Sequence, residues 1–205
     1  MANLTQKNGN PTVKRRLATT EGCLYDLSDE LPMFFKAFED ACKRYNQEIL
    51  HTPPEARCRG FEAILFNSKL IQGIQTYFPD DWKFGKYKRF IFCKKGYLVL
   101  FKKLNSKGMP MNIKTKMVDS INYQMMESLF DSLDFYEEPI LYFGYKKDRI
   151  GNIYQPQLVY IDENKVRWSI DERDVEAKNI RAIEKPSEEI ALPKLKTIKK
   201  KAMNE

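Results

Sequence analysis

Histidine is the scarcest chemistry-bearing residue in this 205-residue chain, which contains only His51. A single histidine excludes acid–base mechanisms that use two histidines, and it excludes metal sites that take two histidines from one chain. A Ser–His–Asp or Cys–His arrangement would have to use His51 itself. His51 begins a His-Thr-Pro-Pro segment, which is typical of a turn between helices. We therefore expect His51 to be a surface residue.

Close cysteine pairs and glycine-rich loops are also missing. The absence of any Cys-x-x-Cys pair speaks against zinc-ribbon and thioredoxin-type sites. No Gly-x-Gly-x-x-Gly or Gly-x-x-x-x-Gly-Lys-Ser/Thr run occurs, so a standard nucleotide-phosphate loop is excluded. We expect no cofactor and no metal, and we expect the cysteines to be reduced, buried thiols. The four cysteines are Cys23, Cys42, Cys58 and Cys93.

Long apolar runs are absent as well. No stretch approaches the roughly 18 apolar residues that a membrane helix needs. Residues 1–20 contain basic residues but no apolar run, so we expect no signal peptide, no membrane contact and a cytoplasmic protein. Hydrophobic residues still make up 42% of the chain and aromatic residues 13%, which is enough for a packed core and excludes a wholly disordered chain.

Helical spacing of apolar residues is clearest between residues 29 and 49, after a suitable N-cap at Ser28. A second helical pattern follows the two prolines at 53 and 54 and continues to about residue 78. A third, with Thr115 as its N-cap, spans about 116–130. Between and after these helices, aromatic and β-branched runs predict a hairpin over 89–101, a short edge strand over 109–113, and further strands over 139–145, 153–161 and 165–170.

This order of elements predicts an α+β fold. We expect an antiparallel sheet of about five to six strands, with the N-terminal helices and one inserted helix packed on one face. We expect a flexible basic arm over 1–22, a single domain over 23–170, and a charged, mostly flexible tail over 171–205 with a short helix near 174–183.

The charge pattern is the strongest signal in the chain. Net charge is +7, but residues 82–118 contain no Asp or Glu among many lysines and aromatics. Residues 119–138 carry acids and no Lys or Arg. Pro79-Asp80 resembles the start of a metal-nuclease pattern, but the second carboxylate that would hold Mg²⁺ is missing from 82–118.

A basic hairpin favours binding to phosphates, because counterions are released from the nucleic acid, and its aromatic residues can stack on unpaired bases. Two arginines before the second helix are not explained by the helix dipole, which favours acids there; they bind phosphate or form an ion pair with Asp29, Glu30 or Glu55. The predicted nucleic-acid-binding residues are Lys83, Lys86, Lys88, Arg89, Lys94, Lys95, Lys102, Lys103, Lys107, Arg57 and Arg59.

Two other interpretations of the basic stretch stay open. The basic face can bind an acidic protein surface, or it can serve solubility alone, with lysines outside the sheet and aromatics inside. Asp148 and Arg149 in a hairpin loop either contact a ligand or close the turn.

The leading hypothesis is a small, cytosolic, non-enzymatic protein that binds nucleic acid or a nucleoprotein. The first alternative is a metal-independent RNase-type toxin that uses Arg57, Arg59, Tyr87, Lys102 or Arg149. The second is a protein-binding inhibitor or adaptor. The Lys-, Asn- and Ile-rich composition resembles that of small proteins carried by phages, plasmids and toxin–antitoxin loci, which suggests a regulatory or host–mobile-element conflict role.

Overall fold

The computed structural model describes residues 13–126, 129–130 and 137–183. The helices are α1 (Thr20–Asp26), α2 (Glu30–Glu48), α3 (Phe61–Tyr77), α4 (Lys116–Asn122) and α5 (Glu172–Ile183), with short 3-10 turns η1 (Ile49–His51), η2 (Pro54–Ala56) and η3 (Lys86–Lys88). The strands are β1 (Trp82–Gly85), β2 (Arg89–Lys94), β3 (Tyr97–Lys103), β4 (Ile140–Lys147), β5 (Ile153–Asp162) and β6 (Lys165–Ile170).

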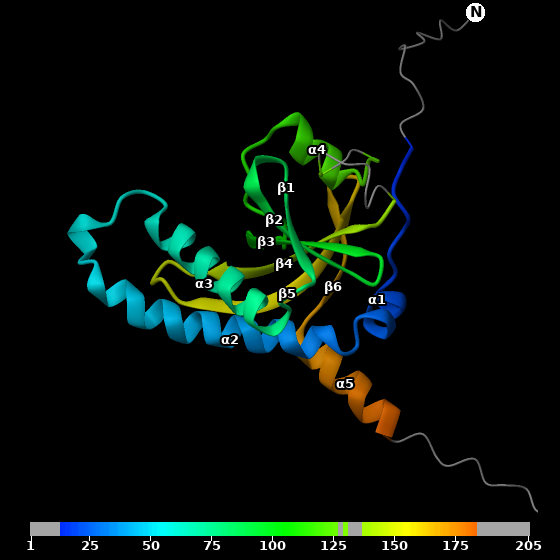
Figure 1. The fold of residues 1–205 in the computed structure, drawn as a ribbon, viewed down its shortest axis with the longest axis horizontal. Helices are drawn as coiled ribbons and strands as arrows, with labels where there is room; N and C mark the ends of the chain where they lie inside the picture. The colour runs from blue at the N-terminus through cyan, green and yellow to red at the C-terminus, as the bar shows by residue number, and fades with distance from the viewer. Residues whose placement is uncertain (1–12, 127–128, 131–136, 184–205) are drawn as a thin grey trace, which may run out of the picture.

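The six strands form one sheet in the order β1-β2-β3-β4-β5-β6 (Figure 1). Neighbouring strands are antiparallel except β3 and β4, which run parallel. The parallel pair arises because the connection from β3 to β4 is long and carries α4, which gives it the length of a crossover. The predicted α+β fold with about six strands is confirmed, and the parallel pair is the departure from a wholly antiparallel sheet.

The helices cover both faces of the sheet, not one. On one face, Phe34 of α2 packs with strand residues that include Phe92 and Phe143. On the other face, Ile121 of α4 joins a separate apolar cluster that includes Leu100 and Tyr142. Figure 1 shows α2 and α3 along one side of the sheet and α4 on the opposite side. The one-sided packing that we expected is therefore wrong for the inserted helix, because the central strands are apolar on both faces and each face must be covered.

The predicted helices and hairpin are present, with two differences of extent. Helix α4 ends at Asn122 instead of near 130, because Gln124 takes a left-handed backbone with φ of 52°. The expected edge strand at 109–113 reduces to one bridge between Leu104 and Pro110, since proline offers no N–H to a ladder. Strand β1 was not expected from the sequence.

Residues 13–22 lie against the domain. Arg15 is 2% exposed and its backbone N–H donates to the Gln124 carbonyl oxygen at 2.7 Å. The Trp168 indole N–H donates to the carbonyl oxygen of Ala18 at 2.8 Å. We expected this stretch in a flexible arm, whose residues 1–12 lie outside the described part. At the other end, the helix expected near 174–183 is present as α5, and residues 184–205 lie outside the described part.

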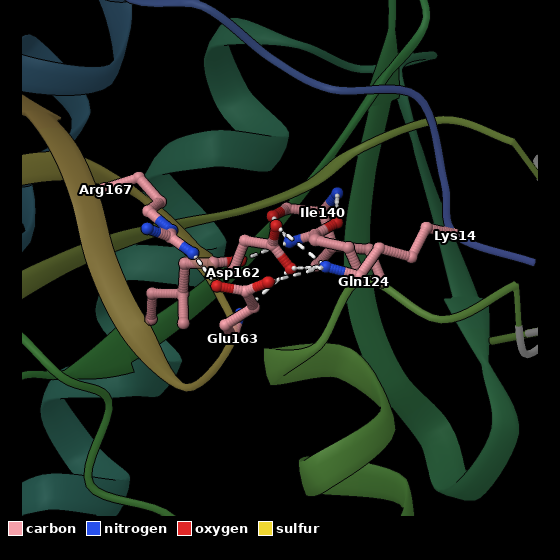
Figure 2. A network of polar contacts seen from close by, with 7 residues as sticks. Lys14, Gln124, Ile140, Asp162, Glu163 and Arg167 are labelled. Carbon is pink, nitrogen blue, oxygen red and sulfur yellow. Dashed lines mark hydrogen bonds and ion pairs between the residues drawn. The ribbon is translucent and has the colours of Figure 1, made fainter. Parts of the chain in front are cut away.

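Figure 2 shows the polar network that holds this N-terminal segment. Lys14 Nζ lies 3.0 Å from Asp162 Oδ1 at the end of β5, and the neighbouring Glu163 pairs with both Lys14 and Arg167. Beside them, the buried side chain of Gln124 bonds to the main chain of Ile140 and Ile161. Among the helices that the structure describes, none has the length and apolar character needed to cross a membrane.

Candidate nucleic-acid interface

The predicted basic hairpin contains a gap in its own sheet. Strands β2 and β3 pair over only three positions, the last of which is Phe92 with Val99. Beyond that point β2 continues to pair with β1 as far as Arg89, while β3 continues to pair with β4 as far as Lys103. The two strands therefore stop pairing before the register would bring Ile91 beside Leu100 and then Phe90 beside Phe101.

A cavity of about 310 Å³ opens at this separation, and we call it the β2–β3 cavity. Its lining comes from both strands, from α3 on one side of the sheet, and from α4 and the segment before it on the other. Three cations line it, and no acidic side chain does so among the residues that the structure describes. The cations are Lys88, Arg89 and Lys102; the aromatic residues are Phe84, Tyr87, Phe90, Phe101 and Tyr142; the amides are Asn67 and Asn112.

The edge of the cavity carries strained backbone and exposed aromatic rings. Tyr87 and Lys88 are consecutive residues with left-handed φ angles of 59° and 53°. Residues other than glycine, asparagine and aspartate rarely adopt this conformation, and strain of this kind concentrates at functional sites. Tyr87 is 90% exposed and Phe84 is 57% exposed. Two large rings are thus presented to solvent beside the cavity cations.

The cavity cations have no carboxylate partners. Lys88, Arg89 and Lys102 form no ion pair with any residue that the structure describes. Partial burial, and then the positive charge of Arg89, lower the pKa of the Lys102 ammonium group. Two uncompensated cations held near each other form a site that favours an anion. Asn112 and Tyr142 also line the cavity, so an amide and a phenol lie in its wall.

Lys94 and Lys95, at the tip of the hairpin, lie in a different environment. Lys94 Nζ is 2.6 Å from Asp81 Oδ2, and Lys95 Nζ is 3.0 Å from Glu30 Oε2. Hydrogen bonds to Asp81 and to Glu30, respectively, raise the pKa of the two ammonium groups. Both lysines therefore neutralise acids of this same chain, including Glu30, which is only 3% exposed. They do not join the β2–β3 cavity.

Arg57 and Lys103 line a second cavity of about 380 Å³, on the α3 side of the sheet. The Arg57 guanidinium donates to the carbonyl oxygens of Thr52 and Ile49 at 2.9 and 3.0 Å and pairs with Glu62 at 3.2 Å. Lys147 also pairs with Glu62, and these contacts lower the pKa of its carboxyl group. Of the two interpretations of Arg57, the ion pair is thus present, with Glu62 in place of Asp29, Glu30 or Glu55.

The other predicted binding residues are spread over the surface. Lys83 and Lys86 lie on or just after the edge strand β1, Lys107 lies in the turn after β3, and Arg59 lies in the loop before α3. None of them lines the β2–β3 cavity. The basic stretch thus contributes Lys88, Arg89 and Lys102 to one site.

The candidate enzyme residues are separated in the same way. Tyr87 and Lys102 line the β2–β3 cavity, Arg57 lines the second cavity, and Arg59 and Arg149 line neither. Asp148 accepts hydrogen bonds from the backbone N–H groups of Gly151 and Asn152 at 2.7 and 2.8 Å, so it closes its turn. The structure does not bring the five RNase candidates into one cleft.

The remaining chemistry-bearing residues lie apart from the cavity. His51 is exposed in η1, as predicted. All four cysteines are free thiols, and the expectation that they are buried holds only for Cys23. Cys42 and Cys93 are half-buried and Cys58 is exposed. Within the described part of the chain, no three His, Cys, Asp or Glu side chains gather where they could hold a metal ion.

Sequence reasoning missed Asn67 and Asn112, and it counted Phe84 only as one of the aromatic residues of the basic stretch. Phe84 lies on the unexpected strand β1. Asn67 lies on α3 and Asn112 in the segment before α4, on opposite sides of the sheet. No local pattern marks residues that meet only through the fold. In comparisons with known proteins, no family model, no curated protein and no solved structure matches the chain. The functional argument therefore rests on the site itself.

Proposed function

We propose that this protein is a cytosolic protein that binds single-stranded nucleic acid through the β2–β3 cavity and the exposed rings beside it. The observation that carries the proposal is the composition of the cavity: three unpaired cations, two exposed aromatic rings and no described acid. Cations attract the phosphates, and a tyrosine ring presented to solvent provides a stacking surface for an unpaired base. A nucleic-acid ligand uses both features together, whereas an acidic protein uses only the charge.

Salt dependence of binding tests this proposal. Labelled single- and double-stranded RNA and DNA are titrated with the full chain from about 50 to about 300 mM salt. We expect single strands to bind more tightly than duplexes, with affinity that falls steeply as salt rises. The triple variant Lys88→Ala, Arg89→Ala and Lys102→Ala should bind at least about tenfold more weakly at low salt.

The matched control removes three positive charges elsewhere. Lys36 and Lys43 on α2 and Lys165 on β6 are all exposed and lie outside the cavity. Their joint substitution by alanine changes the net charge equally, so it should leave most of the affinity in place. Equal weakening by both triple variants would mean that net charge alone drives binding and would contradict a defined site. Absence of binding at the lowest salt would exclude a nucleic-acid ligand and favour an acidic protein partner.

A second candidate function has one supporting observation. Tyr87, Arg89 and Lys102 line the same cavity, and such groups can stabilise a phosphorane and transfer protons without a metal. An RNase of this kind would shorten RNA in the presence of EDTA. Running the bound RNA on a denaturing gel distinguishes this activity from binding alone. Intact RNA after prolonged incubation would exclude the nuclease, whereas cleavage that is lost in Lys102→Ala would replace the binding proposal.

A further inference from the structure

The separation of β2 from β3 leaves main-chain groups directed into the cavity. The N–H group of Leu98 donates to the carbonyl oxygen of Pro139, just before β4, and that of Leu104 donates to the carbonyl oxygen of Tyr145, in β4. Even-numbered residues of β3 therefore direct their peptide groups toward β4, and odd-numbered residues such as Phe101 direct theirs toward β2. The ladder between β2 and β3 ends at Val99, two residues before Phe101.

Strand β2, which forms the opposite wall of the cavity, directs its peptide groups in the same alternating way. The Cys93 N–H donates to the Asp81 carbonyl oxygen at 2.7 Å, so odd-numbered residues of β2 direct their peptide groups toward β1. Phe90 then directs its N–H and C=O toward β3, where the register would place Phe101. The main-chain groups of Phe90 and Phe101 thus lie on the facing edges of the two strands, beyond the last pair of the ladder.

A side-chain amide adds to these groups. Asn67 of α3 lines the cavity and is half-buried. A carboxamide offers a donor and an acceptor side by side, which is the arrangement that pairs with the edge of a nucleobase. The main-chain groups of Phe90 and Phe101 and the Asn67 amide together suit a flat, polar-edged group.

We infer that the β2–β3 cavity holds a single nucleotide, with its base between β2 and β3 and its phosphate on Arg89 and Lys102. This inference rests on the proposed function and names the unit that the site recognises. The volume of about 310 Å³ is at the lower end of the range for small-molecule sites, which fits one nucleotide and not a run of bases. A base in a duplex cannot enter, because its edge is already paired. The exposed ring of Tyr87 then receives the next base of the strand.

Trp82 provides a reporter for this site. Its ring centroid lies 5.5 Å from that of Phe84 and 5.4 Å from that of Phe90, and both phenylalanines line the cavity. The other tryptophan, Trp168, lies on β6 at the opposite edge of the sheet. Fluorescence titrations are run on the Trp168→Phe variant, which retains the reporter, and on the Trp82→Phe variant, which lacks it. The probes are the four nucleoside 5′-monophosphates, the corresponding nucleosides and inorganic phosphate.

We expect a nucleoside 5′-monophosphate to change the fluorescence of the Trp168→Phe variant saturably and to displace a labelled single strand. Nucleosides and inorganic phosphate should each bind at least about tenfold more weakly, because each makes only half of the contacts. The Asn67→Ala variant should weaken nucleotide binding and leave phosphate binding unchanged. Asn67 is half-buried on α3, so this substitution leaves the fold intact, which a thermal melt checks.

Three results would overturn the inference. Equal affinity for phosphate and nucleotide would reduce the site to a simple anion site. Fluorescence changes that persist in Trp82→Phe would place the nucleotide elsewhere. A strand that binds tightly but is not displaced by millimolar mononucleotide would lie on the surface, which leaves the proposed function standing and rejects the single-nucleotide site. Failure of the proposed function is distinct, because then no single strand binds at all.

Discussion

The side chain of Gln124 bonds to Ile140 as a neighbouring strand would. Its Nε2 donates to the Ile140 carbonyl oxygen at 2.9 Å, and the Ile140 N–H donates to its Oε1 at 3.0 Å. A further bond of 2.7 Å runs from Nε2 to the Ile161 carbonyl oxygen, so one fully buried side chain joins the ends of β4 and β5 (Figure 2). Gln124 thereby fixes the end of α4, the helix that walls one side of the β2–β3 cavity.

Replacing Gln124 by alanine should lower the free energy of unfolding by about 2–3 kcal/mol. The substitution leaves the Ile140 N–H and two carbonyl oxygens buried without partners, and each unpaired group carries a desolvation cost. Urea denaturation measures the change. The control is Gln47→Ala on the exposed face of α2, which should change stability by less than about 0.5 kcal/mol. Equal stability of the two variants would mean that water or main-chain movement replaces the Gln124 bonds.

A second stability prediction concerns the hairpin tip. The double variant Lys94→Ala and Lys95→Ala should be destabilised by about 1–3 kcal/mol, because the buried carboxylate of Glu30 loses both partners. This figure is below that of a fully buried pair, since both lysines are partly exposed. Adding Glu30→Gln should restore part of the stability, because no buried charge then remains. A triple variant no more stable than the double would contradict this account.

The same double variant tests whether the lysines of the hairpin tip contribute to binding as the cavity cations do. If Lys94 and Lys95 neutralise acids of the chain itself, their removal should leave the slope of log affinity against log salt unchanged. We predicted from the sequence that these residues bind nucleic acid together with Lys102 and Lys103. A slope that falls by about two would show that both contact phosphates despite their ion pairs.

Local patterns account for most of the fold but not for the site. The apolar spacing over 29–49 and the Lys-Gly turn at 95–96 act within a few residues, so helix α2 and the β2–β3 hairpin follow from them directly. The side of the sheet that α4 covers is decided by tertiary packing. The end of α4 depends on Gln124 bonding to strands far along the chain. Neither feature leaves a local signal.

The candidate site could be predicted only as a charge pattern. The absence of acids from 82–118 pointed to the stretch that contributes Arg89 and Lys102 to the cavity. It could not separate these residues from Lys94 and Lys95, because acids at 29, 30 and 81 lie outside the stretch in sequence and beside it in space. Ion pairs between distant residues are therefore what divides a basic segment into paired and unpaired cations.

Alkaline pH should destabilise the fold through Tyr97. Burial, and then the hydrogen bond to Asp26, raise the pKa of its hydroxyl from 10.0 to about 12. Above pH 10 the unfolded chain loses this proton while the folded chain retains it, so the free energy of unfolding falls as pH rises. Between pH 10 and 12, the Tyr97→Phe variant should lose about 2 kcal/mol less stability than the wild type.

The control for this pH dependence is Tyr25→Phe, since Tyr25 is exposed. Its stability should fall with pH as steeply as that of the wild type. Urea midpoints across the alkaline range supply the measurement for all three proteins. Parallel curves for Tyr97→Phe and the wild type would mean that Tyr97 ionises normally in the folded state.

Replacing Tyr87 by asparagine should separate stability from binding. Asparagine tolerates the left-handed backbone of this position better than tyrosine does, so Tyr87→Asn should not lower the thermal midpoint. The stacking surface is lost, and the affinity for single strands should fall by about fivefold or more, which corresponds to at least about 1 kcal/mol per base. Tyr87→Phe is the matched control and should bind as the wild type does. Unchanged affinity in Tyr87→Asn would exclude stacking on this ring.

Replacing Lys102 should also weaken binding without lowering stability, in this case for an electrostatic reason. Desolvation, and then the positive charge of Arg89, lower the pKa of its ammonium group and disfavour the charged form in the folded protein. In the unfolded chain the group is fully hydrated. Because Lys102 is also exposed in the folded protein, Lys102→Met should leave the free energy of unfolding unchanged or slightly higher. The same variant removes a phosphate contact, and the slope of log affinity against log salt should become shallower by about one.

Lys165→Met on β6 is the control, because it removes an equal charge from an exposed position outside the cavity. It should change neither the stability nor the salt slope of binding. Thermal melts of the three proteins measure the stability, and salt titrations measure the slope of binding. A Lys102→Met variant that is less stable than the wild type would identify Lys102 as a structural residue. A lysine that serves binding lowers the stability of the free protein, and the bound phosphate restores that stability.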